Sequence, residues 1–199
     1  MEFREVVRAR RMTRDFSSAP IDPSVVERCV ELAGRSPSAG KTSGWHLIVL
    51  EGDEVSRYWN IALPAARRAT FTFPGLLAAP FLALVLADPR DYLARYSEPD
   101  KSATGLGHDQ GAWPAPYWTI DAAFATMTLL HALEDEGLGA LFFAHVEESA
   151  LRREFAVPDE VVFLGTLCAG HRAEGAGRPG RSGARPGRSV GEIIHRGRW

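Results

Sequence analysis

The sequence predicts an α+β fold in which helices flank a mixed β-sheet. Helical and strand patterns follow one another along the chain, but in an irregular order that differs from a regular βαβ repeat. The length of 199 residues and the 45% hydrophobic content fit one domain with a sizeable core. The sequence contains no internal repeat, so we expect residues 1–199 to form a single domain.

Apolar spacing and end signals predict the helices. Apolar residues three and four positions apart mark an amphipathic helix. Asp22 is a good N-cap before Pro23, and Gly34 ends that helix. The segment 117–136 is apolar over most of its surface, which indicates a central or interfacial helix buried all round. The predicted helices cover residues 2–9, 23–33, 53–68, 117–136 and 147–155.

Short apolar runs predict the strands, and two further segments stand out by composition. Residues 97–116 are polar, contain Gly and Pro, and are long for a loop, which often indicates a functional segment. Residues 173–189 are of low complexity and lead into a terminal strand or helix at 190–194, so we predict a C-terminal arm over 173–199. The predicted strands cover residues 45–50, 81–87, 140–146 and 161–168.

Composition argues against several partners and sites. A net charge of -2 gives no reason to expect nucleic acid or an anionic membrane as a partner. The most apolar run, 81–87, is too short to span a bilayer, and the N-terminus lacks a signal-peptide core. Cys29 and Cys168 are predicted to be buried thiols, and Cys168 with His171 alone does not make a metal site. We therefore expect a cytoplasmic protein without a metal.

Positive charge gathers at both ends of the chain. Residues 172–199 carry seven arginines and two glutamates, and residues 4–14 carry five arginines and one glutamate. Arginine binds phosphate through two parallel hydrogen bonds and stays charged at any relevant pH. Two basic ends therefore suggest that an anion is held from both sides; the alternative is a solvated charged tail.

The loop at 36–44 is a second candidate for ligand binding. Its small residues at 37–40 allow close backbone approach, and their amides can donate hydrogen bonds to a ligand. Gly40-Lys41-Thr42 looks like the end of a phosphate-binding P-loop, but Arg35 stands where that motif needs glycine. The loop also leads from a helix into a strand, which is the reverse of a P-loop. A plain connection remains the alternative.

These segments together resemble one family. Along the chain stand Arg10-Arg11-x-x-Arg14-x-Phe16, Pro37-Ser38-Ala39-Gly40-x-x-x-x-Trp45, Glu136-Gly137-Leu138-Gly139 and an arginine before a C-terminal apolar run. The ordered set resembles the nitroreductase superfamily over almost the whole chain. The resemblance implies an intertwined homodimer that binds FMN at its interface. It also implies NAD(P)H as electron donor and a planar aromatic or quinone-like molecule as acceptor.

The resemblance further implies which residues bind the cofactor. The basic N-terminal motif should hold the FMN phosphate and the flavin edge, and the Pro-Ser-rich loop should line the flavin from the other subunit. The strand after Gly137-Leu138-Gly139 should pass beside the reactive flavin edge, and a C-terminal arginine should complete the phosphate site. The implied residues are Arg10, Arg11, Met12, Arg14, Pro37, Ser38, Ala39, Gly40, Lys41, Phe142, Phe143, Ala144, His145, Arg185 and Arg188.

Four positions depart from the family pattern. Met12 stands where serine is frequent, Lys41 where asparagine is frequent, Ser43 where glutamine is frequent, and His145 where a small residue is common. These departures change the expected hydrogen bonds to the flavin and leave the phosphate site intact. A positive charge such as Lys41 near the pyrimidine end would stabilise reduced, anionic flavin; the alternative is a solvent-facing loop lysine.

The flavin ring itself performs hydride transfer, so we expect no catalytic side chain. The sequence shows no Ser-His-Asp triad or carboxylate pair at a convincing spacing. Flat aromatic side chains with polar tips suit a planar acceptor, and the alternative is that they pack the start of the following helix. The residues predicted to form the substrate pocket are Phe71, Phe73, Trp113, Tyr117 and Trp118.

Two other functions stay open at this point. One is a family member that uses another hydride donor, such as a deazaflavin, or that acts on a specific metabolite. The other is a non-enzymatic flavin carrier or sensor, which has the same fold.

Overall fold

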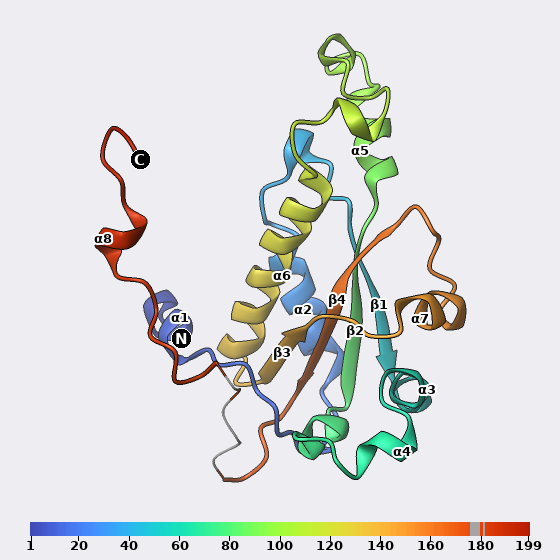
Figure 1. The fold of residues 1–199 in the computed structure, drawn as a ribbon, viewed down its shortest axis with the longest axis vertical. Coiled ribbons are helices and arrows are strands. Elements are labelled where there is room, and N and C mark those ends of the chain that lie inside the picture. Colours follow the sequence, from blue (N-terminus) through green and yellow to red (C-terminus); the bar gives the residue numbers. More distant parts are fainter. Residues whose placement is uncertain (176–179, 181) are drawn as a thin grey trace.

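A four-stranded sheet forms the centre of the molecule. The computed structural model describes residues 1–175, 180 and 182–199. The sheet has the order β1-β2-β4-β3, and its three ladders are antiparallel (Figure 1). Within the described ranges, parallel pairing is limited to one bridge between Met12 and Ala140. The α+β class is therefore confirmed. A mixed sheet was expected, but the three ladders between named strands are antiparallel, and the described parallel pairing consists of this bridge. The strands are β1 Trp45–Glu51, β2 Phe81–Ala87, β3 Gly139–Phe143 and β4 Val162–Gly170.

The predicted helices are found with one correction, and the structure adds a helix at Pro89–Tyr96 that the sequence analysis did not predict. The side chain of Asp22 accepts a hydrogen bond from the Ser24 amide at 2.9 Å, as expected of an N-cap. The predicted helix over 53–68 is interrupted, because Pro64 lacks an amide donor and disfavours helical geometry at Leu63. The helices are α1 Phe3–Ala9, α2 Pro23–Ala33, α3 Asp53–Ala62, α4 Ala65–Arg68, α5 Pro89–Tyr96, α6 Tyr117–Asp135, α7 Glu148–Glu154 and α8 Val190–Ile193.

The central strand β2 is buried along its whole length because helices cover both faces of the sheet. Its side chains alternate between two clusters, as the period of a strand requires. Leu82, Leu84 and Leu86 pack with residues of α3 and α7. The other side chains of β2 pack with α2 and α6 on the opposite face (Figure 1). This two-sided burial explains the uninterrupted apolar run at 81–87.

Both cysteines are buried free thiols, as predicted. Burial raises the pKa of Cys29 to about 11 and raises that of Cys168 well above its usual range. The native protein should therefore react slowly with a thiol reagent at pH 8. The unfolded chain loses these protons from about pH 9, so the free energy of unfolding should fall as the pH rises from about 9 to about 11. Rapid labelling of both thiols in the native protein would contradict this prediction.

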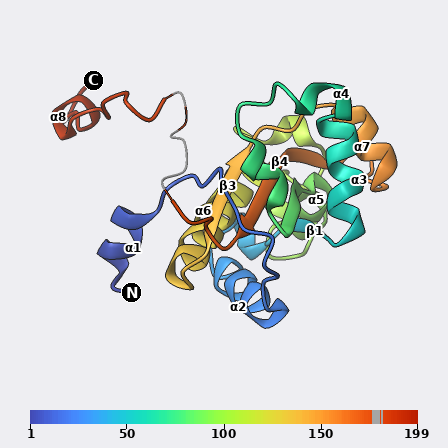
Figure 2. The same cartoon turned by 90° about the horizontal axis from the view of Figure 1, so that it is seen from below.

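The terminal helices lie at one side of the body. Figures 1 and 2 show α1 and α8 on the same side of the molecule, beyond α6. Residues 176–179 and 181 of the predicted arm lie outside the described residues. The exposed apolar side chains on these two helices and the C-terminus are Phe3, Val7, Val190, Ile193, Ile194 and Trp199.

The long helix α6 is only partly buried within the protomer. Phe124 is 49% exposed and Met127 is 38% exposed, so the expected burial on all sides is not reached by one chain. No helix of the described part is long and apolar enough to cross a membrane. Phe124 and Met127 stand seven and four residues before His131, which contacts Phe3 of α1, so helical spacing puts them on the face of α6 toward α1.

Candidate functional site

The two basic ends of the chain lie side by side next to β3. The Thr13 amide donates to the carbonyl oxygen of Ala140 at 2.9 Å, and the Ser17 amide donates to that of His171, also at 2.9 Å. The Ala173 amide in turn donates to the carbonyl oxygen of Asp15 at 3.2 Å. Strand-like pairing at the sheet edge thus brings the N-terminal arginine motif against the segment that follows β4.

A hollow of about 590 Å³ opens between these segments. It adjoins a second hollow of about 270 Å³, and Arg14 and Asp15 belong to the walls of both. The larger volume falls in the range of small-molecule binding sites, roughly 300–1,000 Å³. The larger hollow is lined by Arg11, Met12, Thr13, Arg14, Asp15, Arg172, Ala173, Gly175, Gly180 and Gly183. The smaller one is lined by Arg14, Asp15, Phe71, Thr72, Phe73, Pro74 and Gly75.

Arg14 keeps most of its hydrogen-bonding capacity. One guanidinium nitrogen donates to the carbonyl oxygen of Met12 at 2.9 Å, and the group lies 5.4 Å from the centre of the Phe73 ring. In the parts of the chain that are described, no carboxylate is ion-paired with it. Since a guanidinium carries five N–H donors, Arg14 can still bind an anion in the hollow.

The two neighbouring arginines of the motif differ from Arg14. The Arg11 guanidinium is occupied at the end of α1, where it donates to the carbonyl oxygens of Arg8 and Arg10 at 2.5 and 2.9 Å. The Nε and Nη1 groups of Arg10 are buried and have no hydrogen-bond partner among the residues that the structure describes. Burial, together with the charge of Arg10, lowers the pKa of His131 on α6. Arg10 therefore points toward α6 rather than into the larger hollow, whose lining does not include it.

The structure adds Arg172 to the site, a residue that the sequence motifs did not select. Its guanidinium donates to Glu134 at 2.5 Å and to the carbonyl oxygen of Gly137 at 3.2 Å. The basic composition of residues 172–199 included Arg172, but no pattern distinguished it from the other arginines there. Arg185 and Arg188 are exposed and do not line the larger hollow.

The Pro-Ser-rich loop forms a second group with a defined backbone geometry. A short 3-10 turn spans Ala39–Lys41, and the φ angles of Gly40, Lys41 and Ser43 are 62°, 58° and 56°. A side chain at Gly40 would bring its Cβ within 2.7 Å of the Tyr96 ring, so both the conformation and the space require glycine. Two non-glycine residues in the left-handed region within three positions are unusual and often indicate a functional site.

The arginine group and the loop lie at opposite ends of α6. The Ala39 amide donates to Asp121 near the start of α6, whereas Thr13 pairs with Ala140 beyond its end. From Asp121 to Asp135 the helix rises about 21 Å, at about 1.5 Å per residue (Figure 1). One protomer therefore does not bring the two predicted halves of the cofactor site together.

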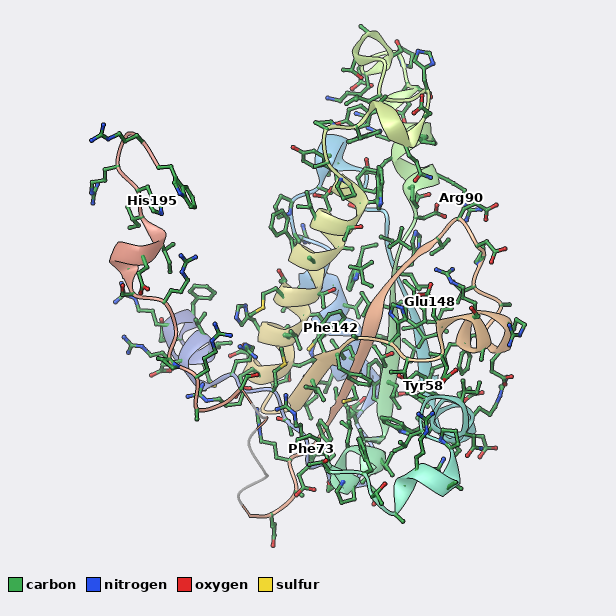
Figure 3. The ribbon with its side chains drawn as sticks, viewed as in Figure 1. Tyr58, Phe73, Arg90, Phe142, Glu148 and His195 are labelled. Carbon is green, nitrogen blue, oxygen red and sulfur yellow. The ribbon has the colours of Figure 1, made fainter. Side chains whose placement is uncertain are left out.

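The segment at the end of β3 contains the remaining predicted cofactor residues. Phe143 stacks on Trp59 with 6.3 Å between ring centres, and His145 stacks on Phe163 at 4.6 Å. His145 also binds Glu148 on α7 at 2.5 Å. Burial alone would raise the pKa of Glu148, but hydrogen bonds from Arg152 and His145 lower it below its usual range. Figure 3 shows Phe142 on β3 and Glu148 on α7, so this segment spans from the sheet to α7.

The predicted substrate-pocket residues fall into two places. Phe71 and Phe73 line the smaller hollow beside Arg14. Trp113 and Trp118 are 8% and 7% exposed and pack in a core cluster with Tyr92. These two indoles have little surface left for stacking on an acceptor, so their place in a substrate pocket stays a prediction without support from the protomer. Tyr117 is 36% exposed.

Trp113 is expected to stabilise the fold of the segment 97–116. Its indole N–H donates to the carbonyl oxygen of Leu106 at 2.8 Å. Trp113→Phe removes this bond and part of the packed ring, and should lower the free energy of unfolding by about 1–2 kcal/mol. Urea denaturation of the purified variant tests this. Unchanged stability with a raised KM for a bulky quinone would instead place Trp113 in a substrate pocket.

Comparison with known proteins identifies the family. The sequence profile described as "Nitroreductase family" matches residues 7–171. A protein of Archaeoglobus fulgidus, named provisionally as an NADH dehydrogenase/NAD(P)H nitroreductase, is 25% identical over 172 residues; the match covers 84% of this chain and 83% of that protein. The chain belongs to the nitroreductase family.

Solved structures show the same fold. A nitroreductase-like protein from Streptococcus mutans matches with a TM-score of 0.74 and 17% identity, over 98% of this chain and 97% of that one. A provisionally named nitroreductase from Exiguobacterium sibiricum, solved in complex with FMN, has the same TM-score of 0.74, 17% identity and the same coverage of 98% and 97%. The predicted fold is therefore confirmed by neighbours that match nearly the whole chain.

Proposed function

We propose that this protein is an FMN-dependent oxidoreductase, which passes hydride from NAD(P)H through the flavin to a planar acceptor such as a nitroaromatic or a quinone. Membership of the nitroreductase family supports an oxidoreductase. The single observation that carries FMN as the cofactor is the hollow of about 590 Å³ with Arg14 in its wall.

The residues at the hollow fit a terminal phosphate. Arg14 has unused donors there, whereas the buried donors of Arg10 lie toward α6, outside the lining of the hollow. The sequence has no Gly-x-Gly-x-x-Gly site for a second nucleotide, which favours FMN over FAD. The FMN held by the Exiguobacterium sibiricum protein supports the same choice.

We further propose that two copies of the chain form each cofactor site. The arginine motif of one protomer would bind the phosphate, and the loop 37–41 of its partner would line the flavin. The separation of these groups along α6 and the exposed apolar side chains of α1, α6 and α8 support this arrangement. The C-terminal arm would then cross to the partner and bring Arg185 and Arg188 toward the phosphate.

The protein's part in the reaction is binding and orientation. When bound, FMN supplies the hydride chemistry. Arg14 would fix the phosphate end, while the rigid backbone of loop 37–41 would fix the ring by its amides. Lys41 would place a positive charge at the ring. Phe71 and Phe73 would give the acceptor an apolar surface next to Arg14.

The purified protein tests this proposal in two steps. We expect flavin absorbance bands in the protein as isolated, and FMN rather than FAD released on heat denaturation. We then expect steady-state oxidation of NADH or NADPH with a nitroaromatic or quinone acceptor. Bound FMN without turnover would favour the flavin carrier or sensor, and release of FAD would contradict the proposed phosphate site.

A further inference from the structure

We propose that Asp121 is a positioning residue, which holds the loop 37–43 in the shape needed to line the flavin. The inference rests on the proposed function, and it concerns a buried carboxylate outside the segments that the sequence pointed to.

The carboxylate of Asp121 connects the loop to two helices. Asp121 lies on α6 and is 6% exposed. Its Oδ2 atom accepts a hydrogen bond from the Ala39 amide at 2.8 Å and another from the Tyr92 hydroxyl of α5 at 2.9 Å. Burial, together with the hydrogen bond to Asp121, raises the pKa of Tyr92 well above its usual range. The hydroxyl therefore remains a donor, and the buried carboxylate is satisfied by one donor from the loop and one from α5.

A second restraint acts on the next residue of the loop. The Nε group of Arg95 donates to the carbonyl oxygen of Gly40 at 2.9 Å. Arg95 is itself fixed by two hydrogen bonds to Asp100, both 2.8 Å long. The two restraints thus hold adjacent residues, Ala39 from α6 and Gly40 from α5.

The backbone of this loop explains why it needs such restraints. Lys41 and Ser43 have φ angles of 58° and 56°, which are unfavourable for residues with a side chain. Within the loop, the Ser38 hydroxyl accepts from the Ser43 amide at 3.0 Å. Without the anchor at Ala39, the loop can relax toward conformations in which its amides and Lys41 no longer face the flavin. Such relaxation would weaken contacts with the ring and leave the phosphate contacts of the arginine motif unchanged.

Asp121→Asn tests this mechanism with little change in volume. The amide oxygen can take the place of Oδ2 and accept from both Ala39 and Tyr92, so the substitution removes the charge that strengthens these two hydrogen bonds. We expect the dissociation constant of the flavin to rise about tenfold, because both hydrogen bonds that anchor the loop and α5 lose their charge assistance. Because the effect concerns the ring, FMN and riboflavin should be weakened by the same factor. Arg14→Ala should instead weaken FMN and leave riboflavin unchanged.

The measurements are fluorescence titrations of flavin-free protein with FMN and with riboflavin. Glu136→Gln, at the exposed end of the same helix, is the matched control and should change neither constant. Hydrogen exchange gives a readout without flavin: the Ala39 amide should exchange faster in Asp121→Asn than in the wild-type protein.

The outcomes separate this inference from the proposed function. If the wild-type protein binds FMN and Asp121→Asn binds both flavins unchanged, the inference is wrong and the proposed function stands. If Asp121→Asn weakens FMN but not riboflavin, Asp121 acts through the phosphate and the inference is also wrong. If the wild-type protein binds no flavin, the proposed function fails and the inference fails with it.

Discussion

Arg14→Ala should weaken FMN binding about ten- to a hundredfold, because a charge-assisted hydrogen bond contributes roughly 1.5–3 kcal/mol. Arg14 lines both hollows, and its guanidinium has unused donors. The measurement is the dissociation constant of FMN in flavin-free protein. Arg35→Ala removes the same charge from a side chain that is 80% exposed and should change nothing. Wild-type affinity in Arg14→Ala would show that the phosphate binds elsewhere.

Arg188→Ala tests the contribution of the arm separately. The family resemblance pairs a C-terminal arginine with the phosphate, so this change should also weaken FMN. Because Arg188 is exposed in the protomer, its effect requires that the arm reach a site shared with a partner. If Arg14→Ala weakens FMN binding and Arg188→Ala does not, the phosphate site is confined to the N-terminal motif.

Phe124→Asp should abolish both the homodimer and flavin binding. Phe124 is 49% exposed on α6, and a second copy that covers this face would bury it. A carboxylate in such an apolar contact is destabilising by several kcal/mol unless it is paired. Sedimentation at micromolar concentration should give the mass of one chain, and the protein should be colourless. We expect both effects together because one protomer carries the two halves of the site at opposite ends of α6.

A matched control separates this result from unfolding. Ser149→Asp adds the same charge on α7, on the opposite face of the sheet, and should remain a dimer with bound flavin. Circular dichroism should show that the fold of Phe124→Asp is retained. A folded monomer that still binds FMN with wild-type affinity would contradict a site formed by two copies.

Local patterns were sufficient to predict most of the elements. Asp22 and Pro23 mark the start of α2, and the apolar run of β2 reflects burial on both faces. The prediction of one helix over 53–68 was wrong. The apolar spacing continues past Pro64, but the helical backbone does not, because proline has no amide donor. The antiparallel order of the strands depends on contacts between distant segments, and no local pattern contains it.

Local patterns likewise predicted one part of the candidate site and missed another. Motif and charge selected Arg14 and the loop at 37–41, which the structure places at a hollow and in a restrained turn. The basic composition of residues 172–199 included Arg172 without distinguishing it, and no motif pointed to Asp121, because the roles of both depend on pairing between distant segments. The aromatic pattern around Trp113 fits a pocket and a core equally well, and burial in the fold favours the core.

Mixing two defective variants tests most directly whether two chains build each site. Gly40→Leu should disrupt the loop, because its side chain would meet the Tyr96 ring in a left-handed backbone. Arg14→Ala disrupts the arginine group. Each variant alone should bind little FMN. After unfolding and joint refolding, random pairing should restore about a quarter of the wild-type sites, since each mixed dimer has one site with both halves intact. If mixed dimers are shown to form and FMN binding does not recover, a shared site is contradicted. The arginine group and the loop would then act within the same chain.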